Sequence, residues 1–271
     1  MEIKQGGLNS EHSLPVDSLS NHFYQYFKLV IANTPELREE VYKIRYKVYS
    51  QELNYEREEN CWKGMEQDIY DPRSIHCLLM HRSSGLYAGC VRLILADPRN
   101  PEATFPFEKI CHYSLAANST NLNNLPRSSF CEVSRLAVTA EFRKRKGEAQ
   151  TPHGVSYEES ESVENERRHF PLIALGLYLA ATSVFLDVGL DSIFTLMEPR
   201  LARHLRRFGF HFHQIGDLVE HRGKRGGFQI TREAILNNLN PDVLELLQVI
   251  HSDLKMSIIN SVPSLLDCRA A

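Results

Sequence analysis

Apolar residues recur along this chain with two periods, and together these predict alternating strands and helices. Short apolar or alternating runs predict strands at 24–32, 74–81, 86–97, 130–139, 192–197, 210–219 and 228–231. Helical spacing predicts helices after residue 34 and at 107–113, 170–188, 199–208 and 241–259. One hairpin series with two crossover helices predicts a single α/β or α+β domain on a mixed, mostly antiparallel sheet flanked by helices.

The first long helix carries a start signal. Thr34 is placed to cap it, Pro35 takes the first helical position, and a stripe of apolar residues follows at helical spacing.

Two segments lack any apolar period. Residues 1–20 predict a disordered tail, and residues 141–168 predict a mobile polar insertion. The organisation expected is therefore a tail at 1–20, a domain at 21–235 and a helical extension at 236–271.

Composition narrows the function classes. With 271 residues, 42% of them hydrophobic, the chain can bury a substantial core. A net charge of −3 argues against nucleic acid as a partner. Six cysteines without a C-x-x-C pair, no apolar leader and no stretch of 18 apolar residues predict a cytoplasmic protein with reduced thiols. Peripheral membrane contact is possible but not expected, because the amphipathic 241–259 helix more often covers a core.

Polar residues interrupt the predicted strand 130–139. Alternation places Glu132 and Ser134 on one face and Arg135 on the other, unless a bulge re-aims one of them. Each of these groups needs a partner once it leaves water. The strand therefore lines a polar cleft or carries charges that are paired internally, and the rest of the sequence favours the cleft.

A second strand carries an arginine among apolar residues. Arg92 requires a carboxylate if it is buried, and the nearby candidates are Asp68, Asp71 and Glu132. With Arg135, these residues predict an ion cluster on one face of the sheet, which could hold Glu132 as a base. Arg45 on the first helix is, taken alone, typical of a solvated surface arginine, and the acids before residue 74 are typical of a loop cap.

Weaker patterns remain. Arg200, Arg203 and Arg207 make the 199–208 helix basic, which fits a solvated face or, together with Lys144, a docking surface for an acidic carrier. The stretch 144–149 approximates a pyrophosphate-binding glycine turn, but no helix follows it directly. The histidines at 211 and 213 lack further ligands at suitable spacing, so no metal site is expected.

Several separated motifs agree in order and spacing with one known family. They are Arg45-Tyr-Lys-Val-Tyr49 with Tyr55, Met65-Glu66-Gln-Asp68-Ile-Tyr-Asp71, Val91-Arg92, Glu132-Val-Ser134-Arg135-Leu-Ala-Val138 and His169-Phe170-Pro171. Over residues 37–210 the chain resembles the autoinducer (acyl-homoserine-lactone) synthases. The motifs Met197-Glu-Pro-Arg-Leu-Ala-Arg203 and Phe208-Gly-Phe are more similar to the bacterial PEP-CTERM/exosortase-system-associated acyltransferases, a branch similar to the N-acyl amino acid synthases.

The resemblance implies a GNAT-like fold and an N-acyltransferase that moves a fatty acyl chain from acyl carrier protein to a small amine acceptor, such as an amino acid. It implies no separate cofactor, since the acyl carrier protein is a donor substrate. It assigns catalysis to Glu132, Ser134 and Arg135, and substrate binding to Arg45, Tyr49, Tyr55, Asp68, Asp71 and Arg92. Tyr49 and Tyr55 depart from the phenylalanine and tryptophan usual around the acceptor pocket of those synthases.

The expected mechanism uses Glu132 as general base on the acceptor ammonium and backbone N–H groups near residues 134–136 as oxyanion donors. Three alternatives stay open. One is an acyl-homoserine-lactone synthase using S-adenosylmethionine, another is a coenzyme A-dependent acetyltransferase, and the third is a non-catalytic binding module of the same fold.

Overall fold

The computed structural model of the protein describes residues 18–116, 122–143, 151–153 and 172–261. Its centre is an eight-stranded sheet with the order β1-β2-β3-β4-β5-β8-β6, and β7 pairs with β8 beside that path. Every neighbouring pair is antiparallel except β4 with β5, which is parallel. The strands are β1 (Phe27–Ile31), β2 (Ser74–His81), β3 (Tyr87–Ile94), β4 (Phe130–Val138), β5 (Ser192–Met197), β6 (His213–Gln214), β7 (Val219–Glu220) and β8 (Lys224–Thr231).

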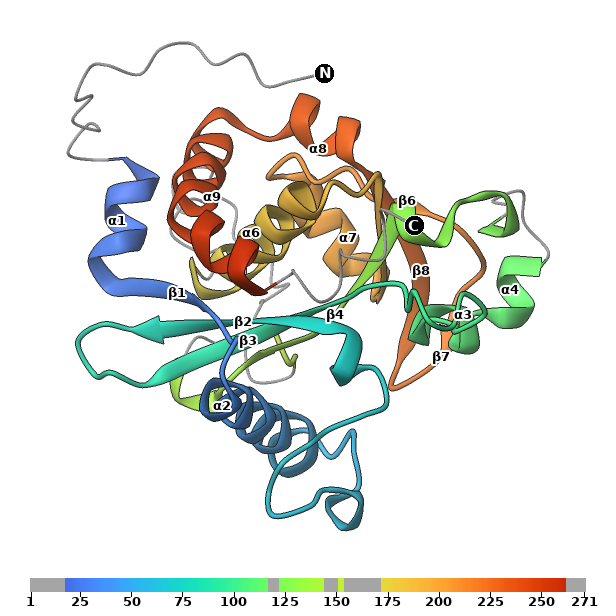
Figure 1. Ribbon diagram of the computed structural model, residues 1–271, viewed down its shortest axis with the longest axis horizontal. Helices are drawn as coiled ribbons and strands as arrows, with labels where there is room; N and C mark the ends of the chain where they lie inside the picture. The colour runs from blue at the N-terminus through green and yellow to red at the C-terminus, as the bar shows by residue number, and fades with distance from the viewer. Residues whose placement is uncertain (1–17, 117–121, 144–150, 154–171, 262–271) are drawn as a thin grey trace.

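Helices cover both faces of this sheet (Figure 1). They are α1 (Leu19–Tyr26), α2 (Pro35–Arg45), α3 (Pro106–Ile110), α4 (His112–Ala116), α6 (Leu172–Val188), α7 (Pro199–Arg206), α8 (Arg232–Asn238) and α9 (Pro241–Ser261). Helices α6 and α9 pack together over one face, and α2 packs against β2, β3 and β4 on the other. The expected class, a mixed and mostly antiparallel sheet flanked by helices, is confirmed.

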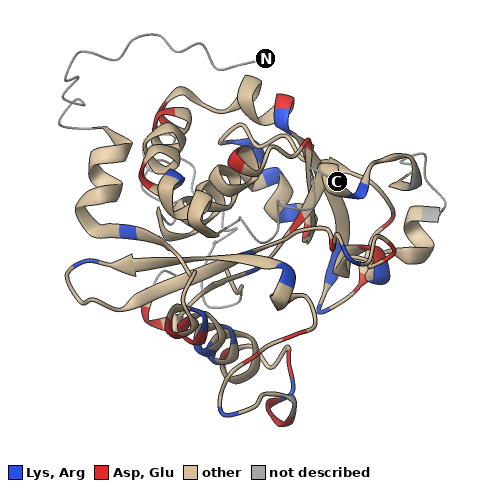
Figure 2. Ribbon diagram, in the orientation of Figure 1, with Lys and Arg blue, Asp and Glu red and all other residues tan. Residues whose placement is uncertain are grey.

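Helix α2 begins as its sequence predicts. The Thr34 side chain accepts a hydrogen bond from the Leu37 amide at 3.3 Å, and Pro35 opens the helix. Val41 and Ile44 are buried under the sheet. The helix then widens into a π-helical segment, Tyr46–Glu52, which keeps Val48 and Tyr49 buried. Charged residues run along its outer side (Figure 2).

Helix α6 forms the main core with the sheet. Thirteen of its seventeen residues are buried, so it is apolar nearly all round, as expected for a helix enclosed by other elements. Helix α9 closes its outer side with Val243, Leu246, Leu247, Ile250, Leu254 and Ile258. The structure thus uses the amphipathic C-terminal helix to cover the core. None of the described helices combines the length and the apolar character needed to cross a bilayer.

The expected strand over 24–32 is wrong in its first part. Ser18 caps α1, which runs to Tyr26, and only then does β1 begin. Phe23 of α1 is fully buried against Gly176 of α6, where an added Cβ would lie 2.4 Å from the phenyl ring. Docking against another helix therefore decides the conformation here, and the isolated apolar pattern could not show it.

Other elements differ in extent. The single helix expected at 107–113 is two short helices, α3 and α4. The strand expected at 210–219 is reduced to β6 and β7, with Gly216 between them close against Ser114. Five cysteines are free thiols in the described part of the chain, as predicted. Residues 1–17 of the expected tail and most of the polar insertion lie outside the described residues, whereas residues 18–20 begin α1 and are not disordered. The three-part domain division stays a prediction.

Candidate active site

Strand β4 changes character halfway along its length. Its first three residues, 130–132, pair with β5, and after them the register with β5 ends. On the β3 side the register shifts between Cys90 and Arg92, so the two residues 135 and 136 lie opposite Val91 alone. This is a β-bulge, and Arg135 sits in it with a left-handed φ of 52°. The bulge that the sequence analysis allowed for is present.

A pocket opens where β4 and β5 separate. Its polar end is lined by Tyr49, Ser134, Arg135, His153 and Arg225. Its other walls are mostly apolar and come from α6, α7, β5, β8 and the segments beside them: Val133, Leu136, Ala181, Ile193, Leu196, Met197, Leu201, Leu205, Phe210, Phe212, Ile230 and Ile235. Thr182, Thr195 and Glu198 add polar groups to these walls. The pocket therefore joins a hydrocarbon-lined space to a charged end at the bulge.

A buried ion cluster lies beside the polar end. Arg45 is completely buried, and its guanidinium donates to Glu66 at 2.5 Å and to Asp71 at 2.6 Å. Burial works against the charge of Arg45, but the two carboxylates outweigh it and raise its pKa. For Glu66, burial alone would raise the pKa, yet Arg135 and Arg45 lower it to about 2. Arg45 and Glu66 are therefore both charged at neutral pH.

Arg92 links this cluster to the strand. Its Nη1 donates to Asp68 at 2.6 Å and to Asp71 at 2.9 Å, while its Nε donates to the Ser134 hydroxyl at 3.1 Å. The Ser134 oxygen accepts this bond, so its own hydrogen is left to donate elsewhere. Because Ser134 also lines the pocket, its O–H group is available to a bound substrate.

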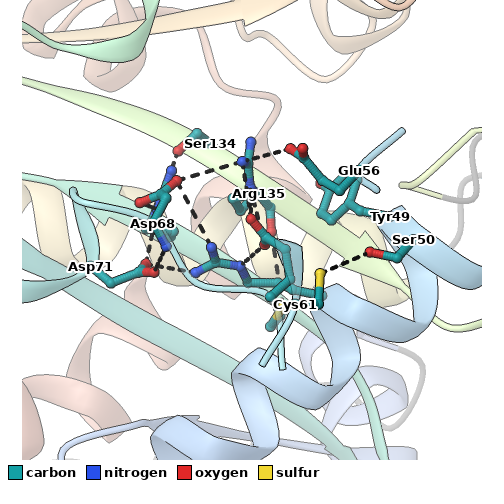
Figure 3. Close-up of polar contacts among 12 residues, drawn as sticks. Tyr49, Ser50, Glu56, Cys61, Asp68, Asp71, Ser134 and Arg135 are labelled. Atoms are coloured by element: carbon teal, nitrogen blue, oxygen red, sulfur yellow. Dashed lines mark hydrogen bonds and ion pairs between the residues drawn. The ribbon is translucent and has the colours of Figure 1, made fainter. Parts of the chain in front are cut away.

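Arg135 extends the cluster towards the surface (Figure 3). Its Nη2 lies 3.0 Å from Glu56, 3.2 Å from Glu66 and 3.5 Å from Asp68. Glu56 in turn accepts from Arg222 at 2.5 Å. The network therefore reaches the turn between β7 and β8, far along the chain.

Two tyrosines flank the same end. The Tyr49 hydroxyl donates to the Leu136 carbonyl within the bulge at 2.8 Å, and the Arg135 guanidinium lies 5.4 Å from the Tyr49 ring centroid. Tyr55 lies 6.4 Å from Tyr49, centroid to centroid. Burial raises the pKa of Tyr49 to about 12, so it acts here as a neutral hydrogen-bond donor.

Glu132 does not join the ion cluster, and this part of the expectation is wrong. The register places it between Ile94 of β3 and Phe194 of β5, both fully buried. Its Oε2 accepts from the Phe107 amide at 3.0 Å, and no ion pair reaches it from the described residues. Burial raises the pKa of Glu132 to about 8, against the smaller opposing effects of that amide and of Arg92. At neutral pH it is mainly protonated.

No curated protein matches the chain. Residues 44–152 match the family described as acetyltransferase (GNAT) domain. TofI, solved in a ternary complex with an inhibitor and MTA, is 19% identical, with a TM-score of 0.53 over 83% of this chain and 99% of its own. The AHL synthase LasI is 18% identical, with a TM-score of 0.48 over 79% and 96% of the two chains. FeeM, an N-acyl amino acid synthase from uncultured soil microbes, is 14% identical, with a TM-score of 0.49 over 78% and 91%.

The chain has a GNAT fold. The resemblance stated from the sequence, to autoinducer-synthase-like GNAT proteins, is confirmed at this level, and the domain match supports acyltransferase activity. In this GNAT fold, the bulged half of β4 and its separation from β5 create the pocket. Donor and acceptor are not fixed by the likeness, because such low identity establishes a fold and not a substrate.

Most of the residues expected at the site meet in this GNAT domain. Arg45, Asp68, Asp71, Arg92 and Arg135 form the ion cluster. The solvated interpretation of Arg45 is excluded, since it is completely buried. The arginines expected to dock a carrier protein, Arg200, Arg203 and Arg207, are exposed on or at the end of α7, and Lys144 lies outside the described residues.

Sequence reasoning missed four charged residues. Glu66 stands inside a motif that was recognised, and the need of Arg45 and Arg135 for partners would have singled it out. Glu56, Arg222 and Arg225 carried no such signal. Pairing of β7 with β8 brings Arg222 and Arg225 to the site, and both guanidiniums lie within 5.8 Å of the Tyr55 ring centroid. No sequence period predicts that contact.

Proposed function

We propose that the protein is an N-acyltransferase that moves a fatty acyl chain from acyl carrier protein to the amine of an amino acid or similar small acceptor. One observation carries this proposal: a pocket that is apolar along most of its walls and polar at one end, opening at a bulge in a GNAT sheet. An acyl chain suits the apolar part, and a small polar acceptor suits the charged end.

The bulge supplies hydrogen-bond donors for the reaction. Beyond Glu132, β4 has no register partner in β5, so its backbone groups on that edge face the pocket. In the proposed reaction the amine nitrogen attacks the thioester carbon and the carbonyl oxygen becomes an oxyanion. The oxyanion then re-forms the carbonyl, the C–S bond breaks, and the departing sulfur takes the surplus proton of the nitrogen and leaves as the carrier thiol. Backbone N–H groups at 134–136 and the Ser134 hydroxyl would stabilise that oxyanion.

Glu132 is proposed as the group that accepts the amine's proton, and it does so in its ionised form, which is the minor form at neutral pH. Its pKa of about 8 is far closer to that of an ammonium than the pKa of an ordinary carboxyl, which favours proton transfer between them. Glu132 is buried and does not line the pocket, so the transfer would pass through a water molecule. Ser134, two residues further on the same face, marks the direction of that path.

Helix α7 is proposed to receive the carrier protein. Leu201 and Leu205 on its inner side line the pocket, while Arg200, Arg203 and Arg207 are exposed. An acidic carrier attracted to these arginines would therefore present its acyl arm close to the apolar walls.

The test uses purified wild-type protein and Glu132→Gln with a fatty acyl carrier protein, the matching acyl-coenzyme A, and amino acids or S-adenosylmethionine as acceptors. Mass spectrometry of the products identifies both substrates. We expect N-acyl amino acids from the carrier-bound donor, and a rate roughly 10²- to 10⁴-fold lower in the variant. Glu40→Gln, which changes an exposed glutamate on α2, serves as the matched control.

Each failure has a separate meaning. An unchanged rate in Glu132→Gln removes that residue as the base. A homoserine lactone product would show that S-adenosylmethionine, and not an amino acid, is the acceptor. Faster reaction with the acyl-coenzyme A would show that acyl carrier protein is not the preferred donor. No N-acyl product in the assay or in lipid extracts of a producing host favours the non-catalytic module.

A further inference from the structure

One arginine of the pocket has a buried donor without a partner. Arg225 of β8 lines the polar end, and its Nε is buried and makes no hydrogen bond. In the part of the chain that the structure describes, no aspartate or glutamate lies within ion-pair distance of it. Its guanidinium instead lies 5.8 Å from the Tyr55 ring centroid. A buried guanidinium donor without an acceptor is costly unless a ligand supplies one.

The charges of the other arginines at this site are already paired, although Arg45 and Arg92 each keep one buried Nη2 without a hydrogen bond. Arg45 and Arg92 are held by Asp71 together with Glu66 or Asp68, and Arg135 and Arg222 share Glu56. These four guanidiniums and four carboxylates balance. Glu132 adds no charge while it is protonated, and His153 beside Arg225 is kept neutral by burial, with a pKa of about 3. Within this network, adding Arg225 leaves one positive charge unmatched; Glu198 also lines the pocket, but it makes no ion pair with Arg225.

We propose that Arg225 binds the carboxylate of the acceptor, so that the acceptor is an amino acid and not a simple amine. This inference rests on the proposed function and refines it. Arg45, Arg92 and Arg135 are less suited to this role, because their acidic partners engage them. The planar guanidinium of Arg225 offers the geometry that a carboxylate binds best.

The position of Arg225 favours a carboxylate over the phosphate of the donor. Arg225 lies at the same end of the pocket as Ser134 and Tyr49, next to the bulge where the thioester would react. The carrier's phosphodiester is separated from its thioester by the whole pantetheine arm. The acceptor's carboxylate is separated from its amine by one carbon in an α-amino acid.

The experiment measures binding first, without turnover. Full-length wild type, Arg225→Gln and Arg225→Lys are titrated calorimetrically with glycine, L-leucine, their carboxamides and inorganic phosphate. Lys224→Gln, an exposed neighbour on the same strand, is the control. We expect wild type and the control to bind the acids roughly 10- to 100-fold more tightly than the amides. Arg225→Gln should lose that preference, and Arg225→Lys should keep part of it.

The assay of acyl transfer then separates the two proposals. Arg225→Gln should raise KM for the amino acid at least tenfold and leave KM for the acyl donor unchanged. Equal binding of acid and amide by wild type, or an intact preference in Arg225→Gln, overturns the role of Arg225. Arg225-dependent binding of phosphate but not of carboxylate also overturns it. If wild type acylates no amine, the proposed function fails, and the titrations alone still decide the carboxylate site.

Discussion

Two buried glutamates, Glu66 and Glu132, show how differently one protein can treat the same side chain. Both are almost inaccessible to solvent, at 4% and 1% exposure. Glu66 lies between two guanidiniums, and its pKa falls to about 2. Glu132 lies between an isoleucine and a phenylalanine, and burial raises its pKa to about 8. Burial therefore does not decide the charge of a carboxyl group here, and its partners do.

The same contrast divides strand β4. Its first part, which includes Phe130, is fully paired and packs against Phe105, Phe107 and Phe194. Its second part is bulged, has lost its β5 partner and faces the ion cluster. Glu132 and Ser134 are only two residues apart across this boundary. A carboxyl group with a raised pKa thus stands two residues from the polar end of the pocket without forming an ion pair with the cluster there.

The largest effect should come from removing the charge of Glu66. Glu66→Gln leaves the buried Arg45 and the partly buried Arg135 undercompensated, so we expect the free energy of unfolding to fall by about 3 to 5 kcal/mol. Denaturant unfolding measures it. Glu40→Gln, which breaks the exposed pair with Lys43 on α2, should cost less than about 1 kcal/mol. Equal losses in the two variants would contradict the buried-cluster interpretation.

The pH dependence of stability should differ in sign between the two glutamates. Glu132 binds its proton more tightly when folded, so its contribution is fully present below pH about 4.5, its ordinary pKa, and is lost as the pH rises through about 8. Glu66 stabilises above pH about 4.5 and loses this contribution as the pH falls through about 2.

Unfolding of wild type and Glu132→Gln between pH 5 and 9 measures the first effect. The variant cannot ionise at this position, so we expect it to gain stability relative to wild type as the pH rises to about 8. A difference that is constant over this range would show that Glu132 has an ordinary pKa in the folded protein.

A smaller effect on stability is expected at Ser134, where the paired first part of β4 meets its bulged second part. Ser134→Ala removes the acceptor of the Arg92 Nε bond but leaves the Asp68 and Asp71 contacts in place. We expect a loss of about 1 to 3 kcal/mol in the free energy of unfolding, with the pKa of Glu132 unchanged. A shift in the Glu132 titration, followed by carboxyl NMR, would show that the two halves of β4 are coupled more closely than their contacts indicate.

Much of this arrangement could be predicted from the sequence. Thr34 and Pro35 define the start of α2, and an arginine among the apolar residues of β3 required acids, which Asp68 and Asp71 supply. These predictions succeeded because they depend on local geometry or on the cost of an unpaired charge. The local geometry and the need of a buried charge for a partner can both be inferred from the residue types in the motif.

The environment of Glu132 could not be predicted in the same way. Whether it faces Arg92 or Phe194 depends on which strand pairs with which, and on a one-residue shift in register at the bulge. The approach of Arg225 to Tyr55 depends on a hairpin formed about 170 residues later in the chain. Helix α1 likewise depends on a space left by Gly176. Contacts between residues far apart in the chain decide each of these three features, and the local sequence pattern does not predict such contacts.

The left-handed conformation of Arg135 has a consequence for how this fold keeps its shape. An L-residue with a side chain enters that region only at a cost of about 1 to 2 kcal/mol, which here the salt links to Glu56 and Glu66 can offset. Acid strong enough to discharge those partners would let the main chain relax, and the mouth between the diverging strands would change its outline. We therefore expect the φ angle of Arg135 to depend on the ionisation of these two carboxylates.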